Sequence, residues 1–363
     1  MKNTFGNAVT LTLFGESHGE EIGCVLDGLS PGMEVDLKTV ENALAKRRPA
    51  GGISTGRREP DAFRIVSGVY GGKTTGTPLC ILIPNVAQRS ADYQQQTAYR
   101  PGHADFTADM KYHGFQDPRG GGHFSGRLTA PLVAAGAVLR SALEKKGIVI
   151  GTHIASIHGV ADAPFSGTEE EMKRLKDAAF PVLSHEAGEK MQKEILAFKE
   201  RGDSVGGTLE TCVTGMPAGV GEPWFDSLES ILSHALFSIP AVKGVEFGAG
   251  FGFATLCGSE ANDAFINENG SIRTRTNHNG GINGGITNGM PLVFRTVIKP
   301  TPTVSVLQDT VDGKTGEAIR LSFGGRHDPC IVHRACIVQE SVTALVLFDA
   351  LSARFGTDFF GEK

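Results

Sequence analysis

The sequence lacks the features that would direct a chain to a membrane or to an oxidising compartment. No apolar segment follows Met1-Lys2-Asn3-Thr4, as a secretory signal would require. The longest apolar run, Ala130–Leu139, is followed by Arg140 and by further charges at 144–146, which indicates a buried helix and not a membrane span. The six cysteines lack Cys-x-x-Cys spacing, so reduced thiols are expected. We therefore expect a cytoplasmic protein with no membrane partner.

The chain also lacks an excess of positive charge, because 40 acidic residues outnumber 35 basic ones and the net charge is −5. General nucleic-acid binding is therefore not expected. No linker, low-complexity segment or internal repeat divides the sequence, and its strands and helices alternate without dinucleotide-fold spacing, which favours a single α+β domain over 1–363. Glycine is abundant instead: the 48 glycines cluster in short polar runs, where the backbone can approach a ligand closely.

The first motif is Gly15-Glu16-Ser17-His18-Gly19, which has the G-x-S-x-G pattern of a hydrolase nucleophile. Such a serine lies on a turn from a strand into a helix. Here Val9–Phe14 predicts a strand before the motif, and Ile22–Leu26 predicts a second strand after it. The motif is therefore expected at a hairpin tip, where Ser17 is not a nucleophile.

The apolar pattern predicts further elements. Helices are expected at Asp36–Arg48 (with Asp36 as N-cap), Ser125–Gly147, Glu169–Phe180, His185–Arg201, Phe225–Phe237 and Val338–Arg354. Strands are expected at Phe63–Tyr70, Thr77–Pro84, Val205–Val213, Val242–Phe247 and Leu292–Ile298. The segment Ser67–Thr74 is one residue short of a P-loop, but it leads into a strand and not a helix, so we expect a hairpin there.

Basic residues gather between positions 46 and 64, around a glycine-rich loop. They are Lys46, Arg47, Arg48, Arg57, Arg58 and Arg64. A solvated helix face would not contain such a loop, and arginine pairs bidentately with carboxylate and phosphate. The stretch therefore predicts an anion pocket.

Five turn-like segments combine glycine with histidine, arginine or asparagine. They are "GESHG" (15–19), "RPGHAD" (100–105), "RGGGHFSGR" (119–127), "NHNGGINGGITNG" (277–289) and "GGRHDPC" (324–330). If these turns converge, they supply basic side chains and backbone amides around one anionic ligand.

In this order the segments resemble the chorismate synthase family. The resemblance is collinear from Gly6 to about Phe348 and includes "FGESHG", "RRP" with "RREPD", "SGVYGGKTTGTPL", "NVAQRSADY", "RPGHAD", "GGINGGI", "KPTPT" and "GRHDPC". It implies the family fold, a β-α-β-α sandwich with helices packed between β-sheets. It also implies a homotetramer.

The resemblance further implies a reaction. Family members convert 5-enolpyruvylshikimate-3-phosphate to chorismate in the shikimate pathway, by 1,4-anti elimination of the 3-phosphate and a C6 hydrogen. They use reduced FMN without net redox change, and the substrate's two carboxylates and phosphate account for an arginine-rich pocket. No flavin-reductase segment is apparent, so an external flavin reductase is expected, and NADPH enters only if the chain reduces its own flavin.

Carried over residue by residue, the resemblance assigns three catalytic groups. His18 matches the histidine near the leaving phosphate, His103 the one beside the flavin, and Asp328 the carboxylate that relays the C6 proton through flavin N5. Arg47 matches a family anion-site arginine, and the anion set is Arg47, Arg48, Arg57 and Arg127. The cofactor set is His123, Phe124, Ser125, Pro240, Ala241, Gly284, Lys299, Pro300, Thr301, Pro302, Thr303 and Arg326.

Some positions depart from the family pattern. Many members read "GGGRSSARET" where this chain reads "GGGHFSGRLT", so that His123, Phe124 and Leu128 replace an arginine, a serine and a glutamate. Pro240 replaces a common asparagine, and the loop after Pro49 is one residue shorter and lacks a second anion-site arginine. These changes put flavin affinity in question more than the reaction.

Other interpretations remain open at this point. A non-redox protein that binds or hydrolyses a phosphate metabolite would use the same basic pocket without flavin. A zinc site would use His327, Cys330, His333 and Cys336, although Pro329 disrupts a helix there and buried thiols are the plainer reading; we predict no metal. A scaffold protein fits the polar glycine-rich loops least well.

Overall fold

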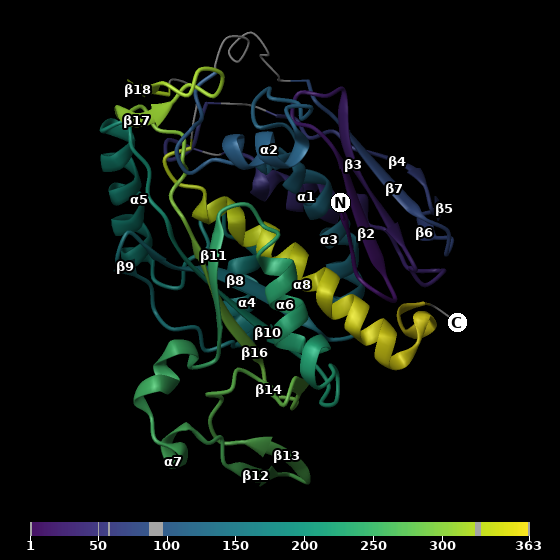
Figure 1. Ribbon diagram of the computed structural model, residues 1–363. Helices are drawn as coiled ribbons and strands as arrows, with labels where there is room; N and C mark the ends of the chain where they lie inside the picture. The colour runs from purple at the N-terminus through teal and green to yellow at the C-terminus, as the bar shows by residue number, and fades with distance from the viewer. Residues whose placement is uncertain (1, 50, 57–58, 87–96, 324–327, 362–363) are drawn as a thin grey trace.

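The structure is a computed structural model that describes residues 2–49, 51–56, 59–86, 97–323 and 328–361. Two five-stranded antiparallel sheets form its framework (Figure 1). The first has the order β1-β2-β3-β7-β4, and its strands are β1 (Thr4–Phe5), β2 (Thr10–Gly15), β3 (Glu21–Asp27), β7 (Leu79–Pro84) and β4 (Arg64–Ser67). The second has the order β11-β16-β10-β8-β9, and its strands are β11 (Val242–Phe247), β16 (Leu292–Ile298), β10 (Gly207–Thr214), β8 (Val149–Ile157) and β9 (Val160–Ala161).

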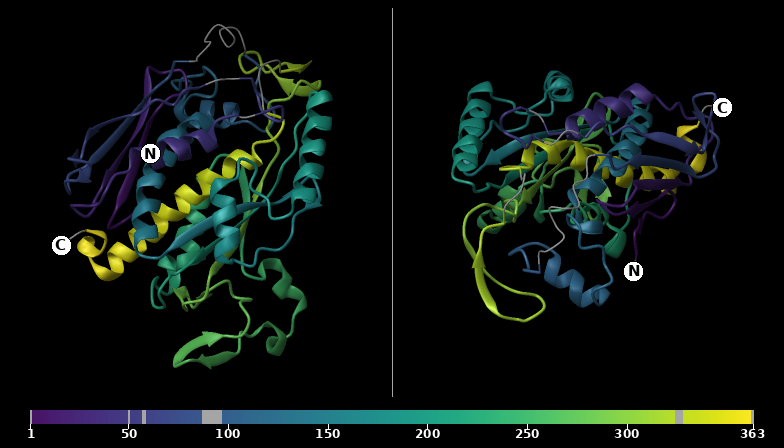
Figure 2. Two further views of the ribbon diagram at one scale, coloured as in Figure 1. Left: turned by 180° about the vertical axis from the view of Figure 1, so that it is seen from behind. Right: turned by 90° about the horizontal axis from the view of Figure 1, so that it is seen from above.

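Helices pack between the two sheets (Figure 2). α3 (Thr129–Lys145) contacts β3 and β7 of the first sheet, whereas α8 (Val332–Phe355) contacts β8 and β10 of the second. α3 and α8 pack on each other, and α1 (Leu37–Arg47) and α6 (Leu228–Leu236) flank them. The α+β class expected from the sequence is thus confirmed.

The remaining elements lie outside this core. The helices are α2 (Asp105–Tyr112), α4 (Glu169–Asp177), α5 (His185–Glu200) and α7 (Gly258–Ala261). The small hairpins are β5 (Val69–Tyr70) with β6 (Lys73–Thr74), β12 (Phe265–Glu268) with β13 (Ser271–Thr274), β14 (Ile282–Asn283) with β15 (Ile286–Thr287), and β17 (Gln308–Val311) with β18 (Ala318–Leu321). Short 3₁₀ turns occur at η2 (Gly122–Phe124), η3 (Gly126–Leu128), η4 (Trp224–Asp226), η5 (Gly250–Thr255) and η6 (Thr357–Phe360).

α8 is long and apolar enough to cross a membrane by length and composition alone, but 94% of its apolar window is buried inside the protein. A helix that is hydrophobic on all faces is what the core between two sheets requires. α8 is therefore a core helix.

The expected elements with clear periodicity agree with the structure. β11 and β16 have the expected bounds, α1 begins after the expected N-cap Asp36, and Ser67–Thr74 forms no P-loop but passes from β4 into the β5–β6 hairpin. Three helix starts were wrong, and one of them is that of α6, which begins at Leu228 and not at Phe225 because residues 224–226 form the 3₁₀ turn η4. α3 begins at Thr129 and not at Ser125, because the glycine-rich 122–128 segment forms two 3₁₀ turns, and α8 begins six residues before Val338.

A buried charged network lies on the face of the second sheet that points away from α8. His153 of β8 is 1% exposed, and its Nδ1 and Nε2 lie 2.9 Å from Asp162 Oδ2 and 3.1 Å from Glu210 Oε2. Burial alone would lower the pKa of His153, but the hydrogen bonds to the two carboxylates outweigh it and raise that pKa. The folded protein therefore binds a proton here more tightly than the unfolded chain does.

We predict that His153→Gln lowers the free energy of unfolding by about 3 kcal/mol at pH 6, because buried Asp162 loses its histidine cation and Glu210 keeps only Arg295, 3.5 Å away. Since the folded pKa is raised above 6.5, this contribution is fully present below that pH and is lost as pH rises through the folded value. Urea denaturation from pH 6 to 9 should show the deficit shrinking. His158→Gln, at a half-exposed histidine, is the control. A loss of unfolding free energy that does not change with pH, or an equal loss in His158→Gln, would contradict the prediction.

Candidate active site

Ser17 and His18 lie in the turn that joins β2 to β3, as the hairpin prediction requires. Both side chains are buried, and Ser17 Oγ lies 3.1 Å from His18 Nδ1. The Ser17 N–H donates to the carbonyl of Gly122 at 3.1 Å, which joins this turn to the glycine run ahead of α3. Because β3 and not a helix follows the motif, Ser17 is not on a nucleophile elbow.

The glycine run Gly120–Gly122 separates two histidines. Gly120 has a φ of +64°, and a Cβ there would overlap the His18 ring. Gly121 has a φ of +118°, and a Cβ there would lie 3.3 Å from Cε1 of His103. The rings of His18 and His103, which are 85 positions apart in sequence, therefore lie against consecutive residues of one backbone segment.

His103 is held in the loop before α2. Its Nδ1 lies 2.7 Å from Asp105 Oδ1, and Asp105 also accepts hydrogen bonds from Arg100. Burial works against ionisation of Asp105, but the hydrogen bonds from Arg100 and His103 hold its pKa far below the ordinary value. Lys299 Nζ donates to the carbonyl of Gly102, which attaches this loop to the second sheet.

The expected cofactor residues at 299–303 lie beside this loop. Pro302 would be 3.5 Å from a Cβ at Gly102, and the Lys299 N–H donates to the carbonyl of Ala241 at 2.9 Å. Ala241 has a φ of +76°, directly after Pro240. Thr301 Oγ1 is buried and has no hydrogen-bond partner among the described residues. A buried hydroxyl without a partner is unusual and indicates a place for a ligand atom.

The departures at 123–125 are accommodated by the 3₁₀ turns. His123 Nδ1 lies 2.8 Å from the carbonyl oxygen of Gly15, and the Phe124 ring meets Tyr112 of α2 edge-on at 6.0 Å. Ser125 Oγ accepts from the Arg127 N–H at 3.2 Å and caps η3. These side chains connect the first hairpin, α2 and α3.

Other expected residues lie elsewhere. Gly284 is in the β14–β15 turn at the Leu292 end of β16, whereas Lys299 follows its other end, about 20 Å away along the strand. Asp328 lies just before α8, where it accepts from the Thr55 N–H at 3.0 Å and from Arg334. Arg57, Arg326 and His327 fall outside the described residues.

Arg47 and Arg127 are buried and paired with carboxylates. Arg47 Nη1 lies 3.3 Å from Asp61 Oδ2, and Arg127 Nη1 contacts both Asp61 and Glu59, the latter at 2.8 Å. Asp61 and Glu59 belong to the "RREPD" motif, where sequence reasoning weighed only the arginines. The two carboxylates therefore compensate the two buried guanidinium groups, and Arg48 adds a third cation at the edge of the cluster.

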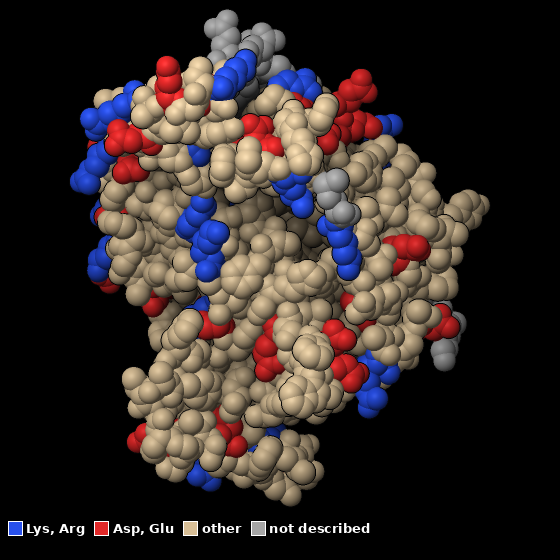
Figure 3. Space-filling view, viewed as in Figure 1, with Lys and Arg blue, Asp and Glu red and all other residues tan. Residues whose placement is uncertain are grey.

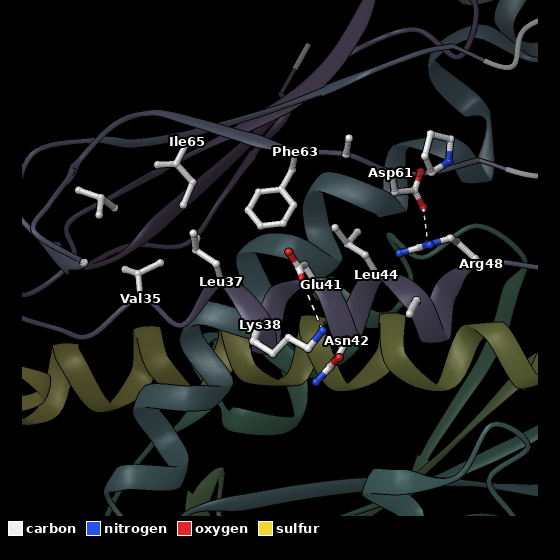
Figure 4. Close-up of a pocket in the computed structure, with 15 residues that line it drawn as sticks. Val35, Leu37, Lys38, Glu41, Asn42, Leu44, Arg48, Asp61, Phe63 and Ile65 are labelled. Atoms are coloured by element: carbon white, nitrogen blue, oxygen red, sulfur yellow. Dashed lines mark hydrogen bonds and ion pairs between the residues drawn. The ribbon is translucent and has the colours of Figure 1, made fainter.

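Arg48 lines an open groove (Figure 4). Arg47 and Arg127, the other described arginines of the expected anion set, do not line it. The groove has a volume of about 770 Å³ between α1 and β4, and Phe63, Leu37 and Ile65 line its apolar side. Arg48 Nε has no hydrogen-bond partner among the described residues and lies 3.9 Å from Asp61 Oδ2. None of the histidines that the structure describes lines this groove.

The zinc interpretation gains nothing from the described residues, among which no cluster of three or more metal-ligating side chains occurs. His333 Nε2 lies 3.0 Å from Ser54 Oγ. Burial raises the pKa of the Cys330 thiol to about 12 and that of Cys336 well above its usual range. Burial thus favours the protonated thiol at both sulfurs, as expected of buried cysteines.

Two glycine-rich turns, a pair of histidines and a lysine-bearing segment thus lie together at loops of an α+β protein, an arrangement typical of sites for small ligands. Figure 3 shows a hollow on this side of the molecule, beneath α2, with Lys and Arg side chains at its margin.

Comparison with known proteins assigns the family. The chorismate synthase family model matches residues 9–352, and the chain belongs to that family. It is 46% identical to the chorismate synthase of Thermococcus gammatolerans over 351 residues, which cover 96% of this chain and 97% of that protein. It is 44% identical to the chorismate synthase of Lachnospira eligens over 358 residues, covering 97% and 96%. A chorismate synthase crystal structure superposes with a TM-score of 0.77 at 29% identity, covering 98% of this chain and 95% of that one.

We predict that Gly120→Ala lowers turnover about a hundredfold, because the new methyl group displaces the His18 ring by the order of an ångström. Gly114→Ala is the matched control, since Gly114 also has a positive φ, +79°, but open space around its Cβ position. Steady-state kinetics of both variants test this. Equal losses in the two variants would attribute the effect to backbone strain and contradict the prediction.

We predict that Asp61→Asn lowers the free energy of unfolding by about 3–5 kcal/mol, because two buried guanidinium groups lose their shared anion. Asp309→Asn provides the comparison, since the Asp309–Arg320 pair is exposed and should contribute less than about 1 kcal/mol. Chemical denaturation of both variants measures the difference. A loss below about 1 kcal/mol for Asp61→Asn would show that the cluster is not an ionic support.

Proposed function

We propose that the chain catalyses the 1,4-anti elimination of phosphate from 5-enolpyruvylshikimate-3-phosphate to give chorismate, with reduced FMN as cofactor. Membership of the chorismate synthase family supports the reaction and makes the chain an enzyme of the shikimate pathway, a phosphate-eliminating lyase. The observation that carries the proposal is the approach of His18 and His103 to consecutive glycines of one turn.

The residues beside His103 fit a flavin. Thr301 offers a buried hydroxyl without a hydrogen-bond partner among the described residues, Lys299 and Ala241 are hydrogen-bonded neighbours, and the glycine turn lets the His18 and His103 rings approach its backbone closely. We propose that the described residues of the cofactor set hold the flavin here, with Gly284 as the exception. Gly284 lies at the other end of the second sheet, so it reaches the same cofactor only from another subunit of a homotetramer.

The protein's own groups bind, orient and move protons. Reduced FMN supplies transient electron donation that eases the departure of the phosphate. His18 is buried beside Gly120 and Ser17, where its ring is fixed and a protonated nitrogen can donate to the leaving phosphate. Asp328 is our proposed carboxylate for the C6 proton, and the Thr55 N–H and Arg334 fix its orientation.

We propose different parts for the arginines. Arg48 keeps donors for a substrate anion, and Arg57 and Arg326 remain in the anion and cofactor sets by family resemblance. Arg47 and Arg127 are both paired with Asp61, and we propose that they support the anion site structurally. We also propose that the protein is a single-domain, cytoplasmic homotetramer of the β-α-β-α sandwich type and that an external flavin reductase supplies reduced FMN.

The test is anaerobic turnover of 5-enolpyruvylshikimate-3-phosphate with chemically reduced FMN, followed by chorismate absorbance. We expect product with reduced FMN and none with oxidised FMN or with NADPH alone. His18→Ala should lower turnover by about a hundredfold or more, whereas His185→Ala, at an exposed histidine of α5, should leave it unchanged. Folded protein that binds FMN but forms no chorismate would overturn the proposal in favour of a phosphate-metabolite binding protein.

A further inference from the structure

His103 has a carboxylate partner on its own loop. Asp105, the first residue of α2, places Oδ1 at 2.7 Å from His103 Nδ1. The two side chains are 17% and 22% exposed, so solvent competes only weakly for this hydrogen bond. An ionised carboxylate only accepts hydrogen bonds, so Nδ1 must carry a proton.

Arg100 holds that carboxylate on its other side. The Arg100 Nε and Nη2 groups donate to Asp105 Oδ2 and Oδ1 at 2.8 and 2.6 Å, and the Arg100 N–H donates to Oδ2 at 2.9 Å. Paired donation from a planar guanidinium fixes the plane of the carboxylate as well as its position. The Arg100 side chain is only 9% exposed, which strengthens this restraint.

The opposite edge of the His103 ring faces the glycine run. A Cβ at Gly121 would lie 3.3 Å from Cε1 and 3.5 Å from Nε2 of His103. Gly102, the residue before His103, accepts a hydrogen bond at its carbonyl from Lys299 Nζ. Lys299 directly follows β16 of the second sheet and places a cation near His103. One ring nitrogen is therefore tied to Asp105, and the other is directed toward the turn that also borders His18.

We infer that Asp105 is a positioning residue for the reaction. It fixes His103 with a proton on Nδ1, so that Nε2 is the nitrogen presented to the cofactor side of the site. A histidine acts through the nitrogen that its partner leaves available, and the partner decides which one that is. The catalytic part of this inference rests on the proposed function, whereas the tautomer it assigns does not.

The experiment compares Asp105→Asn with Asp109→Asn and with a double variant that also carries His103→Ala. Asp109 lies one turn further along α2 and has two side-chain hydrogen bonds of its own, from Tyr99 and Gln116, so it controls for loss of an acid on this helix. Imidazole ¹⁵N shifts, assigned by comparison with His103→Ala, report the tautomer of His103 without cofactor. Turnover is measured with reduced FMN.

We expect Asp105→Asn to lower kcat about tenfold to a hundredfold with little change in KM, and Asp109→Asn to stay within about twofold of wild type. Asp105→Glu should recover part of the loss. The Nδ1-protonated signal of His103 should give way to a mixture in Asp105→Asn, and in the His103→Ala background Asp105→Asn should have no further effect on kcat.

An unchanged His103 tautomer in Asp105→Asn would overturn the inference, and so would an equal kcat loss in the His103→Ala background, since Asp105 would then act on the fold. If wild type forms no chorismate while the tautomer responds as expected, the proposed function fails and the positioning of His103 stands. Thermal unfolding of each variant confirms that a folded protein is being compared.

Discussion

The close contact between α3 and α8 is the constraint on which the rest of the molecule depends. A Cβ at Gly136 of α3 would overlap the Ser341 side chain of α8, so the two helices approach nearer than two ordinary side chains permit. Each helix covers a different sheet, and their contact therefore fixes one sheet relative to the other. The glycine run leads into α3, and Asp328 lies just before α8. The positions of these candidate site residues therefore depend on the same helix contact.

Arg47 connects the three helix ends that this contact brings together. It is the last residue of α1, its Nε donates to Thr129 Oγ1 at the start of α3 at 2.8 Å, and its carbonyl accepts from Arg334 in the first turn of α8 at 2.7 Å. Because Asp61 and Glu59 together balance the charges of Arg47 and Arg127, these two buried cations support the site without adding a large net charge to it.

The sequence predicted the elements that carry a strong local signal. β16 alternates buried and partly exposed residues along its length, and Asp36 caps α1, so their bounds could be predicted. The starts of α3 and α8 could not be predicted in this way. Residues 122–128 form 3₁₀ turns, and His333 and Cys336 lie in the first turns of α8, and both outcomes depend on tertiary packing. In the site, the motifs identified His18 and His103, but the meeting of their rings at Gly120 and Gly121 depends on how distant loops fold together. Asp105 stood in the quoted "RPGHAD" motif, and its histidine-x-aspartate spacing was the signal that could have found it.

The pairing of Arg47 and Arg127 with acids bears on how the proposed anion site would work. The proposed substrate carries three acidic groups, yet two of the arginines expected to meet them are already paired with acids. Under the proposed function, we expect attraction for the substrate to come from cations that no carboxylate holds at close range, such as Lys299, whose Nζ donates to a backbone carbonyl, and Arg48, whose Nε has no hydrogen-bond partner among the described residues. Under the proposed reaction, negative charge grows on the departing phosphate near His18. Because Arg47 and Arg127 are already paired with Asp61 and Glu59, we expect a proton at that histidine, and not these two guanidinium groups, to act on the leaving group.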